Sequence, residues 1–412
     1  MKSTSTLPTG IVTAVAVAVL LNYFDRGSLA TAAPVLQGQL SLSSTQVGLL
    51  FSVFFWTYGP SQLVAGWLVH RFEIRVVLAA GVALWALATA LTGLAAGFAT
   101  ILGLRLVLGL GESVTYPSWL LILSRHVPEH ARGRFGALVA AGQGLGPMLG
   151  TLFGGLAMAR FGWRVMFLGM GTITLLWIWP WLSLTRKGEV RSSTESASTS
   201  IRYVEILQER AFWGAALGHF ASNIPFYFVL TWLPSYLVKA GGFTIVQMAV
   251  ISSIVFGVYA VSTVLAGVLS DRLIVAGYSP GSIRRTILLT GAAGCATTIA
   301  WSALVEPRAA VWLLVLTGIS IGPTSAMTGV VSATLAGPRA AGRWYAAQNL
   351  AGQVAGVIAP IVTGMIVDAT GAFTAAFLFA AAMEVLAMLA WGVVIKEFAP
   401  VNWSTQEYLD TT

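Results

Sequence analysis

Long apolar stretches follow one another along almost the whole sequence, and this pattern constrains the fold more than any other feature. A helix that spans a bilayer needs about 20 mostly apolar residues, and twelve such stretches can be counted. Their approximate limits are 10–34, 46–69, 76–98, 101–124, 135–159, 164–185, 211–237, 246–270, 286–304, 309–334, 343–368 and 373–395. Only 9% of the residues are charged, against about 25% in soluble domains. We therefore predict an all-α membrane protein with twelve transmembrane helices.

One polar segment divides the apolar stretches into two sets of six. Residues 186–210 hold several charged side chains and a Ser/Thr-rich run from Ser192 to Ser200. Because this composition is typical of a linker, we expect a first six-helix bundle in 1–185, a cytoplasmic linker in 186–210, and a second bundle with a short tail in 211–412. Within the linker, Ile201–Arg210 is a candidate for a short amphipathic helix.

The two sets of apolar stretches resemble each other in two places. The loop pattern Gly66-x-x-x-His70-Arg71 matches Gly267-x-x-x-Asp271-Arg272 at an offset of 201, and Gly142, Gln143, Gly146 and Gly154 match Gly352, Gln353, Gly356 and Gly364 at an offset of 210. A longer loop around Gly277–Ser282 accounts for the difference between the offsets. The glycines are interpreted as sites where helices approach closely. Duplicated halves around a central site are a common plan of secondary transporters.

The net charge of +8 indicates membrane orientation rather than nucleic-acid binding, because the basic residues stand singly between apolar stretches. Basic residues accumulate in the cytoplasmic loops of membrane proteins. With the N-terminus inside, only Arg160, Arg164, Lys239 and Arg308 fall on the outer side. We expect a multi-pass protein of a bacterial inner membrane with both termini in the cytoplasm, and no nucleic-acid partner.

The sequence offers no pattern of a catalytic or metal-binding site. Cys295 is the single cysteine, which excludes intrachain disulfides and thiolate metal sites. His126 and His130 are four residues apart, but Pro128 between them favours a loop over a metal-binding helix face. The run Gly142–Pro147 resembles a nucleotide loop only superficially, because no strand precedes it. We expect neither enzymatic activity nor a metal or other cofactor.

Ionisable residues within the apolar stretches indicate where the chemistry lies. The first half holds four of them: Asp25, Arg26, Arg105 and Glu112. Such groups are costly in a membrane and normally face a wet cavity or one another. Burial favours the protonated form of a carboxylic acid, and a nearby guanidinium favours the ionised form. A carboxylate beside a mobile arginine is therefore a proton switch, which makes Asp25 and Glu112 candidates for carrying protons.

The two arginines have different expected roles. Arg26 is the candidate for binding a substrate carboxylate, because a guanidinium offers a bidentate fork that matches it. Arg105 and Glu112 are seven residues apart, so they lie on one helix face about 10 Å apart along the axis. They either take part in proton coupling or form an ion pair that only locks the helix.

Several of these motifs resemble the major facilitator superfamily. The loop Gly267–Arg272 is similar to its inner-loop pattern, and Asn22–Arg26, Arg105–Glu112 and Tyr227–Tyr236 are similar to its anion:cation symporter branch. That branch includes bacterial galactonate and hexuronate permeases, sialin and the vesicular glutamate transporters. The resemblance implies two pseudo-symmetric six-helix bundles, and proton coupling through Asp25, Glu112 and Arg105.

The resemblance also implies roles for further residues. Besides Arg26, the substrate contacts implied are Tyr23, Tyr58, Gln143, Asn349 and Ser325. An inner gate is implied at Arg71, Asp271 and Arg272, although His70 stands where the superfamily usually has Asp. Each polar residue within a stretch has the alternative role of joining neighbouring helices.

Two features have no place in this scheme. Glu384 lies in the middle of the last apolar stretch and is interpreted as a second proton site, a dimer contact or an acid that stays protonated. Tryptophans near the ends of stretches, such as Trp163, Trp213 and Trp344, are expected in the aromatic belt at the membrane interface.

The predicted function is proton-coupled symport of a small organic anion, with a sugar acid as one candidate, by alternating access of a functional monomer in the lipid bilayer. The alternative within transport is an exporter or antiporter of hydrophobic, drug-like compounds, whose site would not require Arg26. A membrane-embedded enzyme or a receptor are alternatives from other classes. The sequence does not identify the anion, the number of protons or the direction of transport.

Overall fold

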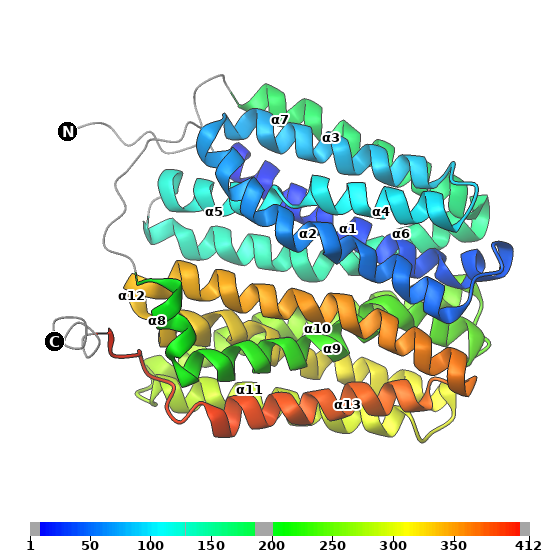
Figure 1. Ribbon diagram of the computed structural model, residues 1–412. Helices are drawn as coiled ribbons and strands as arrows, with labels where there is room; N and C mark the ends of the chain where they lie inside the picture. Colours follow the sequence, from blue (N-terminus) through cyan, green and yellow to red (C-terminus); the bar gives the residue numbers. More distant parts are fainter. Residues whose placement is uncertain (1–8, 128, 186–200, 404–412) are drawn as a thin grey trace. The chain divides into compact units, whose positions relative to one another are not determined.

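The computed structural model describes residues 9–127, 129–185 and 201–403, and helices are the only regular secondary structure in these ranges (Figure 1). The helices of the first half are α1 (Thr9–Gln39), α2 (Ser44–Arg71), α3 (Ile74–Thr92), α4 (Phe98–Glu112), α5 (Thr115–His126), α6 (Glu129–Leu176) and α7 (Ile178–Leu184). The remaining helices are α8 (Tyr203–Gln208), α9 (Arg210–Lys239), α10 (Ile245–Val275), α11 (Pro280–Ser302), α12 (Pro307–Thr370), α13 (Thr374–Leu389) and the π-helix η1 (Ala390–Val394).

The helices account for all twelve predicted spans. Eight helical segments of the described ranges are long and apolar enough to cross a bilayer. Two of these segments, in α6 and α12, each bend at a glycine with a positive φ, Gly162 (81°) and Gly337 (63°), and so contain two spans. Only glycine adopts this backbone conformation without steric cost. The more polar α9 and α11, of 30 and 23 residues, complete the twelve, which confirms the predicted fold class.

The chain forms two compact units, and the first contains the ion-pairing residues of the first half. It consists of α1 to α7 together with Phe228–Ala260 of α9 and α10 and Val357–Phe373 of α12. In this unit α1 packs along α6, α3 lies against both α4 and α6, and α2 packs on α4. A Cβ at Gly146 of α6 would lie 2.5 Å from the Cβ of Tyr23 on α1. This confirms that the glycines here allow close helix packing.

The amino end of α2 is held by a side chain from α12 of the same unit. The Asp368 carboxylate accepts hydrogen bonds from the Ser44 amide (2.8 Å), the Thr45 amide (2.7 Å) and the Thr45 hydroxyl (2.6 Å). A negative charge is stabilising at this end of a helix, where amide groups lack partners. Trp232 of α9 donates a hydrogen bond from its Nε1 to the Pro360 carbonyl of α12 at 3.2 Å. The carboxyl-terminal part of α12 is thereby attached to both α2 and α9.

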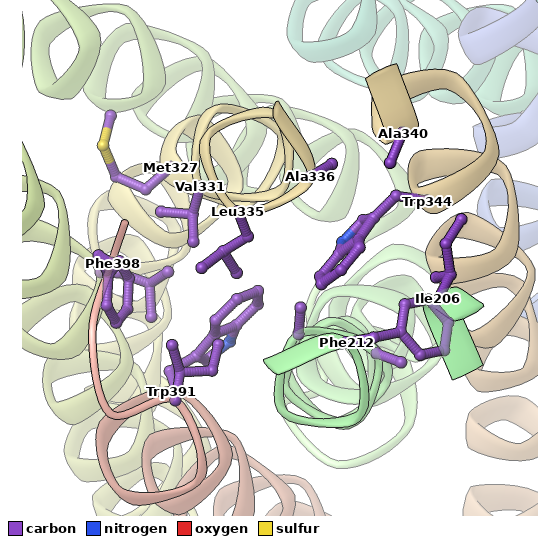
Figure 2. Close-up of a cluster of buried hydrophobic side chains, with 14 of the residues drawn as sticks. Ile206, Phe212, Met327, Val331, Leu335, Ala336, Ala340, Trp344, Trp391 and Phe398 are labelled. Atoms are coloured by element: carbon purple, nitrogen blue, oxygen red, sulfur yellow. The ribbon is translucent and has the colours of Figure 1, made fainter. Parts of the chain in front are cut away.

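The second unit contains α8, α9 up to Tyr227, Val261–Gly356 and the chain from Thr374 onwards. One of its hydrophobic clusters joins the short helix α8 to α12 and η1, and Figure 2 shows the rings of Phe212, Trp344, Trp391 and Phe398 in it. Ile206 of α8 is fully buried there. The amphipathic helix expected within Ile201–Arg210 is thus present as α8.

The tryptophan prediction is wrong at two of its three positions. Trp213 is 56% exposed, as an interface residue would be, but Trp163 and Trp344 are 3% and 0% exposed. Both buried indoles have a partner inside the protein: Trp163 donates to Gln39 Oε1 at 2.7 Å and Trp344 to Gln348 Oε1 at 3.0 Å. Because their N–H groups are satisfied there, they do not need the polar headgroup region.

The division of the chain at 186–210 stays a prediction, since 186–200 lie outside the described residues. The two compact units cut through α9, α10 and α12, so they do not coincide with the predicted bundles and do not test them. The side chains of His126 and His130 also fall outside the described part of the chain.

Candidate functional site

An ion pair between α1 and α4 lies inside the first unit. Arg26 Nε donates to Glu112 Oε2 at 3.0 Å, and the two side chains are 6% and 0% exposed. Among the described residues, Arg105 and Glu112 do not form the direct ion pair considered from the sequence; the direct partner of Glu112 comes from another helix. Breaking a buried pair by removing one partner costs about 3–5 kcal/mol, because the remaining charge has lost its partner.

Three aromatic rings surround the Arg26 guanidinium. Its central carbon lies 4.7 Å from the ring centre of Tyr23, 5.0 Å from that of Phe54 and 4.4 Å from that of Tyr58. The faces of aromatic rings carry negative charge density and attract a cation at such distances. Two of the predicted substrate contacts, Tyr23 and Tyr58, thus lie beside Arg26, while their contact with substrate stays a prediction.

Asp25 points to a different helix from its neighbour Arg26. It is 0% exposed and accepts a hydrogen bond at Oδ2 from the Thr89 hydroxyl of α3 at 3.4 Å. The Trp85 indole, one turn earlier on α3, also lies beside this carboxyl group. Adjacent helix positions differ by about 100° around the axis, which explains why Asp25 meets α3 while Arg26 meets α2 and α4.

Arg105 joins the two acids into one cluster. It is 5% exposed and interacts electrostatically with both Asp25 and Glu112. The cluster contains two acidic and two basic groups, so its charges balance when both acids are ionised. Asp25 Oδ1 and Glu112 Oε1 are buried without a hydrogen-bond donor among the described residues. Each acid therefore has an oxygen at which a proton can be held without breaking an existing hydrogen bond.

The other predicted substrate contacts lie on further helices. Gln143 of α6 donates a hydrogen bond to the Tyr116 hydroxyl of α5 in the first unit. Asn349 and Ser325 belong to the second unit, where Asn349 is half-buried and Ser325 is exposed. The structure brings Tyr23 and Tyr58 to Arg26, and the roles of Gln143, Asn349 and Ser325 stay predictions.

The second unit has a polar set of its own on α9, α12 and α13. Asn223 Nδ2 donates to the Gly352 carbonyl at 3.1 Å, and the Tyr227 hydroxyl donates to Gln353 Oε1 at 3.3 Å. Glu384 of α13 is 1% exposed and accepts a long hydrogen bond, 3.5 Å, from Ser222. Asn223 and Tyr227 thus link α9 to α12, while Glu384 lies beside the Ser222 hydroxyl and near the Cys295 thiol.

The predicted inner-gate residues are all exposed. Arg71 ends α2 in the first unit, and Asp271 and Arg272 lie near the end of α10 in the second. Their contact across the halves stays a prediction.

Sequence reasoning missed the aromatic and hydroxyl groups that complete the cluster. Phe54 stands four residues before Tyr58, and Trp85 stands four before Thr89. Residues at this spacing share one face of a helix, so the signal was available once Tyr58 was selected. Nothing in the sequence, however, connects Thr89 on α3 with Asp25 on α1.

The described residues contain no group of three His, Cys, Asp or Glu side chains that could hold a metal ion. A polytopic membrane protein with a charge-balanced cluster buried within its spans fits the class of transporters, whose functional ionisable groups lie within the membrane. The comparisons with known proteins agree: the family model of the Major Facilitator Superfamily matches residues 15–360. The chain therefore belongs to the Major Facilitator Superfamily.

Its relatives are transporters rather than enzymes. The chain is 29% identical to the hexuronate transporter of Bacillus subtilis, with 93% of this chain and 92% of the relative covered. It is 24% identical to the D-galactonate transporter of Escherichia coli, with 94% and 95% covered. Among solved structures it is similar to a D-xylose–proton symporter, with a TM-score of 0.79 at 16% identity, 94% of this chain and 98% of that chain being covered. The low identity of the last limits that comparison to the fold.

Proposed function

We propose that the protein is a proton-coupled symporter of a small organic carboxylate, with sugar acids as the first candidates. The observation that carries this proposal is the buried contact of Arg26 with Glu112, surrounded by three rings. A guanidinium that is held by an acid and also suited to a carboxylate substrate has two alternative partners. Protonation of the acid decides between them.

The transport cycle follows from this competition. With Glu112 ionised, Arg26 is held in the ion pair and a substrate carboxylate has to displace it. A proton on Glu112 removes the negative charge, and the guanidinium then turns to the substrate anion. Asp25, which shares Arg105 with Glu112, binds a second proton. Release of substrate and protons restores the ion pair and resets the site, as alternating access requires.

The choice of substrate rests on two supports. The cluster offers an arginine for a carboxylate, and the hydroxyls of Tyr23 and Tyr58 beside it suit hydroxyl groups. Two relatives are named as transporters of hexuronate and of D-galactonate. Both of these substrates combine a carboxylate with several hydroxyls. We further propose that the protein works as a monomer in a bacterial inner membrane with both termini in the cytoplasm, and that protons are its coupling ion with no other cofactor.

Uptake into proteoliposomes tests the proposal. Purified protein is reconstituted, and uptake of sugar acids, dicarboxylates, hydroxy acids and aromatic acids is measured under an inward proton gradient. We expect accumulation of at least one carboxylate that stops when a protonophore removes the gradient. Accumulation that is indifferent to the protonophore, or transport of uncharged hydrophobic compounds instead, would contradict the proposed function.

A further inference from the structure

Phe54 differs from the other two rings around Arg26 because it carries no hydrogen-bonding atom. Tyr23 and Tyr58 each have a hydroxyl that can contact a substrate, whereas Phe54 offers only the face of its ring. That ring is 4% exposed and lies 5.0 Å from the guanidinium carbon. Any effect of Phe54 on the anion therefore acts through Arg26 or through packing.

The place of Phe54 is fixed by the close approach of α2 and α4. The Thr57 hydroxyl donates to the Leu106 carbonyl at 2.8 Å, and a Cβ at Gly109 would lie 2.4 Å from the Phe54 carbonyl oxygen. Glu112 follows Gly109 by three residues, so it lies about one helical turn further along α4. The backbone that carries Phe54 and the acid that binds Arg26 are thus held at a fixed separation.

Neighbouring rings fix the orientation of Phe54 as well. It stacks on Tyr58 with ring centres 5.0 Å apart and planes at 23°. Phe55 meets it edge-on at 4.9 Å and 85°. Offset-stacked and edge-to-face arrangements are the favourable geometries of aromatic pairs, so the ring face beside Arg26 has little freedom to turn away.

A ring face stabilises the guanidinium of an arginine without using the in-plane N–H groups of that guanidinium. Those N–H groups are the ones that bind a carboxylate. This difference matters when Glu112 takes up a proton. The guanidinium then loses the charge of its ion-pair partner in a site where its side chain is only 6% exposed, and removing one charge of a buried pair is strongly destabilising. A ring that holds a fixed position at that moment keeps the cation both stable and available.

We propose that Phe54 is a positioning residue for substrate binding: its ring face holds the Arg26 charge while the Glu112 carboxylate is exchanged for the carboxylate of the substrate. This inference rests on the proposed function. Without the ring, Arg26 depends more on Glu112, so Glu112 gives up its negative charge less readily. Anion binding then becomes weaker and requires a lower pH.

The first test compares substitutions at this position. Binding of D-glucuronate and of D-galactonate to purified protein is measured by calorimetry between pH 5 and pH 8.5. In Phe54→Leu we expect affinity to fall about fivefold, within the range of a partly desolvated cation–π contact, and the pH of half-maximal affinity to move lower. Phe54→Tyr keeps the ring and should restore both values towards wild type.

Fluorinated phenylalanines separate the charge effect from packing. Fluorine withdraws electron density from the ring face and changes its shape little, so each added fluorine at Phe54 should weaken anion binding and lower the half-maximal pH stepwise. The same analogues at Phe167, a buried ring that meets Trp163 edge-on in α6, are the matched control and should change neither quantity.

Two outcomes would overturn the inference, and they differ in what else they overturn. In the first outcome, the wild type binds these anions with the expected pH dependence, but fluorination at Phe54 has no effect. This result excludes the role of Phe54 and leaves the proposed function intact, even if Phe54→Leu is impaired by packing. A wild type that binds neither anion, or binds with no pH dependence, removes the proposed function as well.

Discussion

Replacing Glu112 by glutamine removes the negative charge that holds Arg26 and keeps the shape of the side chain. The amide oxygen can still accept a hydrogen bond from Arg26, as Glu112 Oε2 does at 3.0 Å. Glu112→Gln therefore imitates the protonated acid at every pH. It separates the charge of the ion pair from its geometry.

The size of the effect follows from the hydrogen bond that is weakened. A hydrogen bond to a charged group contributes about 1.5–3 kcal/mol and a neutral one about 0.5–1.5 kcal/mol. The midpoints of these ranges differ by about 1.3 kcal/mol, which corresponds to about a tenfold change in an equilibrium constant. Where Glu112 is ionised in the wild type, the anion no longer has to displace a carboxylate in the variant, so Glu112→Gln should bind it about tenfold more tightly.

Calorimetry with D-glucuronate and D-galactonate at pH 5.5 and pH 8.5 provides the measurement. The sign is fixed by linkage: the charge of Glu112 opposes anion binding, so wild-type affinity falls as pH rises and the advantage of the variant grows. At pH 5.5 the two proteins should approach each other. The control is Glu205→Gln, which removes the acid of the exposed Arg202–Glu205 pair on α8 and should behave as wild type. An affinity ratio of variant to wild type that is the same at both pH values would refute the reasoning.

Three further predictions follow from the same contacts. Asp25→Asn should lose accumulation driven by a proton gradient but retain exchange of internal for external anion, both measured in proteoliposomes; unchanged accumulation would exclude it as a proton carrier. Gly146→Ala should lower the thermal unfolding midpoint in detergent, because overpacking costs about 1–3 kcal/mol, whereas Gly169→Ala, with no atom within 4 Å of an added Cβ, should not; equal midpoints would contradict the close packing. Asp368→Ala should also lower that midpoint. Adding Thr45→Val to Asp368→Ala should then have little effect, because the Thr45 hydroxyl has already lost its acceptor. Additive effects of the two substitutions would show that the contact is not formed.

The sequence was sufficient for the fold because membrane spans leave a simple signal. Each span has to present about 20 apolar residues to lipid, so even α6 and α12, whose helices run on across a bend, could be counted as two spans each. The bends themselves depend on the positive φ of Gly162 and Gly337. A chain with 44 glycines does not indicate which of them adopt it.

The candidate site was predictable in its charged members and not in their pairing. Asp25, Arg26, Arg105 and Glu112 stood out because charge is rare in apolar stretches, but spacing along one helix cannot show contacts between helices. It therefore suggested Arg105 as the partner of Glu112, whereas in the structure the partner is Arg26 of α1. Phe54 was missed because an aromatic residue in an apolar stretch looks the same whether it fills the core or covers a cation.

Asp368 was missed for a similar reason. An acid at the end of an apolar stretch resembles an ordinary loop residue, and its hydrogen-bond donors at Ser44 and Thr45 lie 324 and 323 residues earlier in the chain. Only the packed structure brings them together. Both cases show that sequence identifies costly groups well, and that their partners depend on tertiary contacts.

The most direct test of the account is whether binding of the anion is accompanied by uptake of protons. Purified protein in weakly buffered detergent solution at pH 7.5 is mixed with D-glucuronate or D-galactonate while a pH indicator records the solution. Proton uptake is expected in the wild type, because the anion takes Arg26 from Glu112 and leaves that carboxylate to be protonated, and less uptake is expected in Glu112→Gln. Anion binding by the wild type with no change in pH, or with proton release, would contradict the exchange of partners at Arg26.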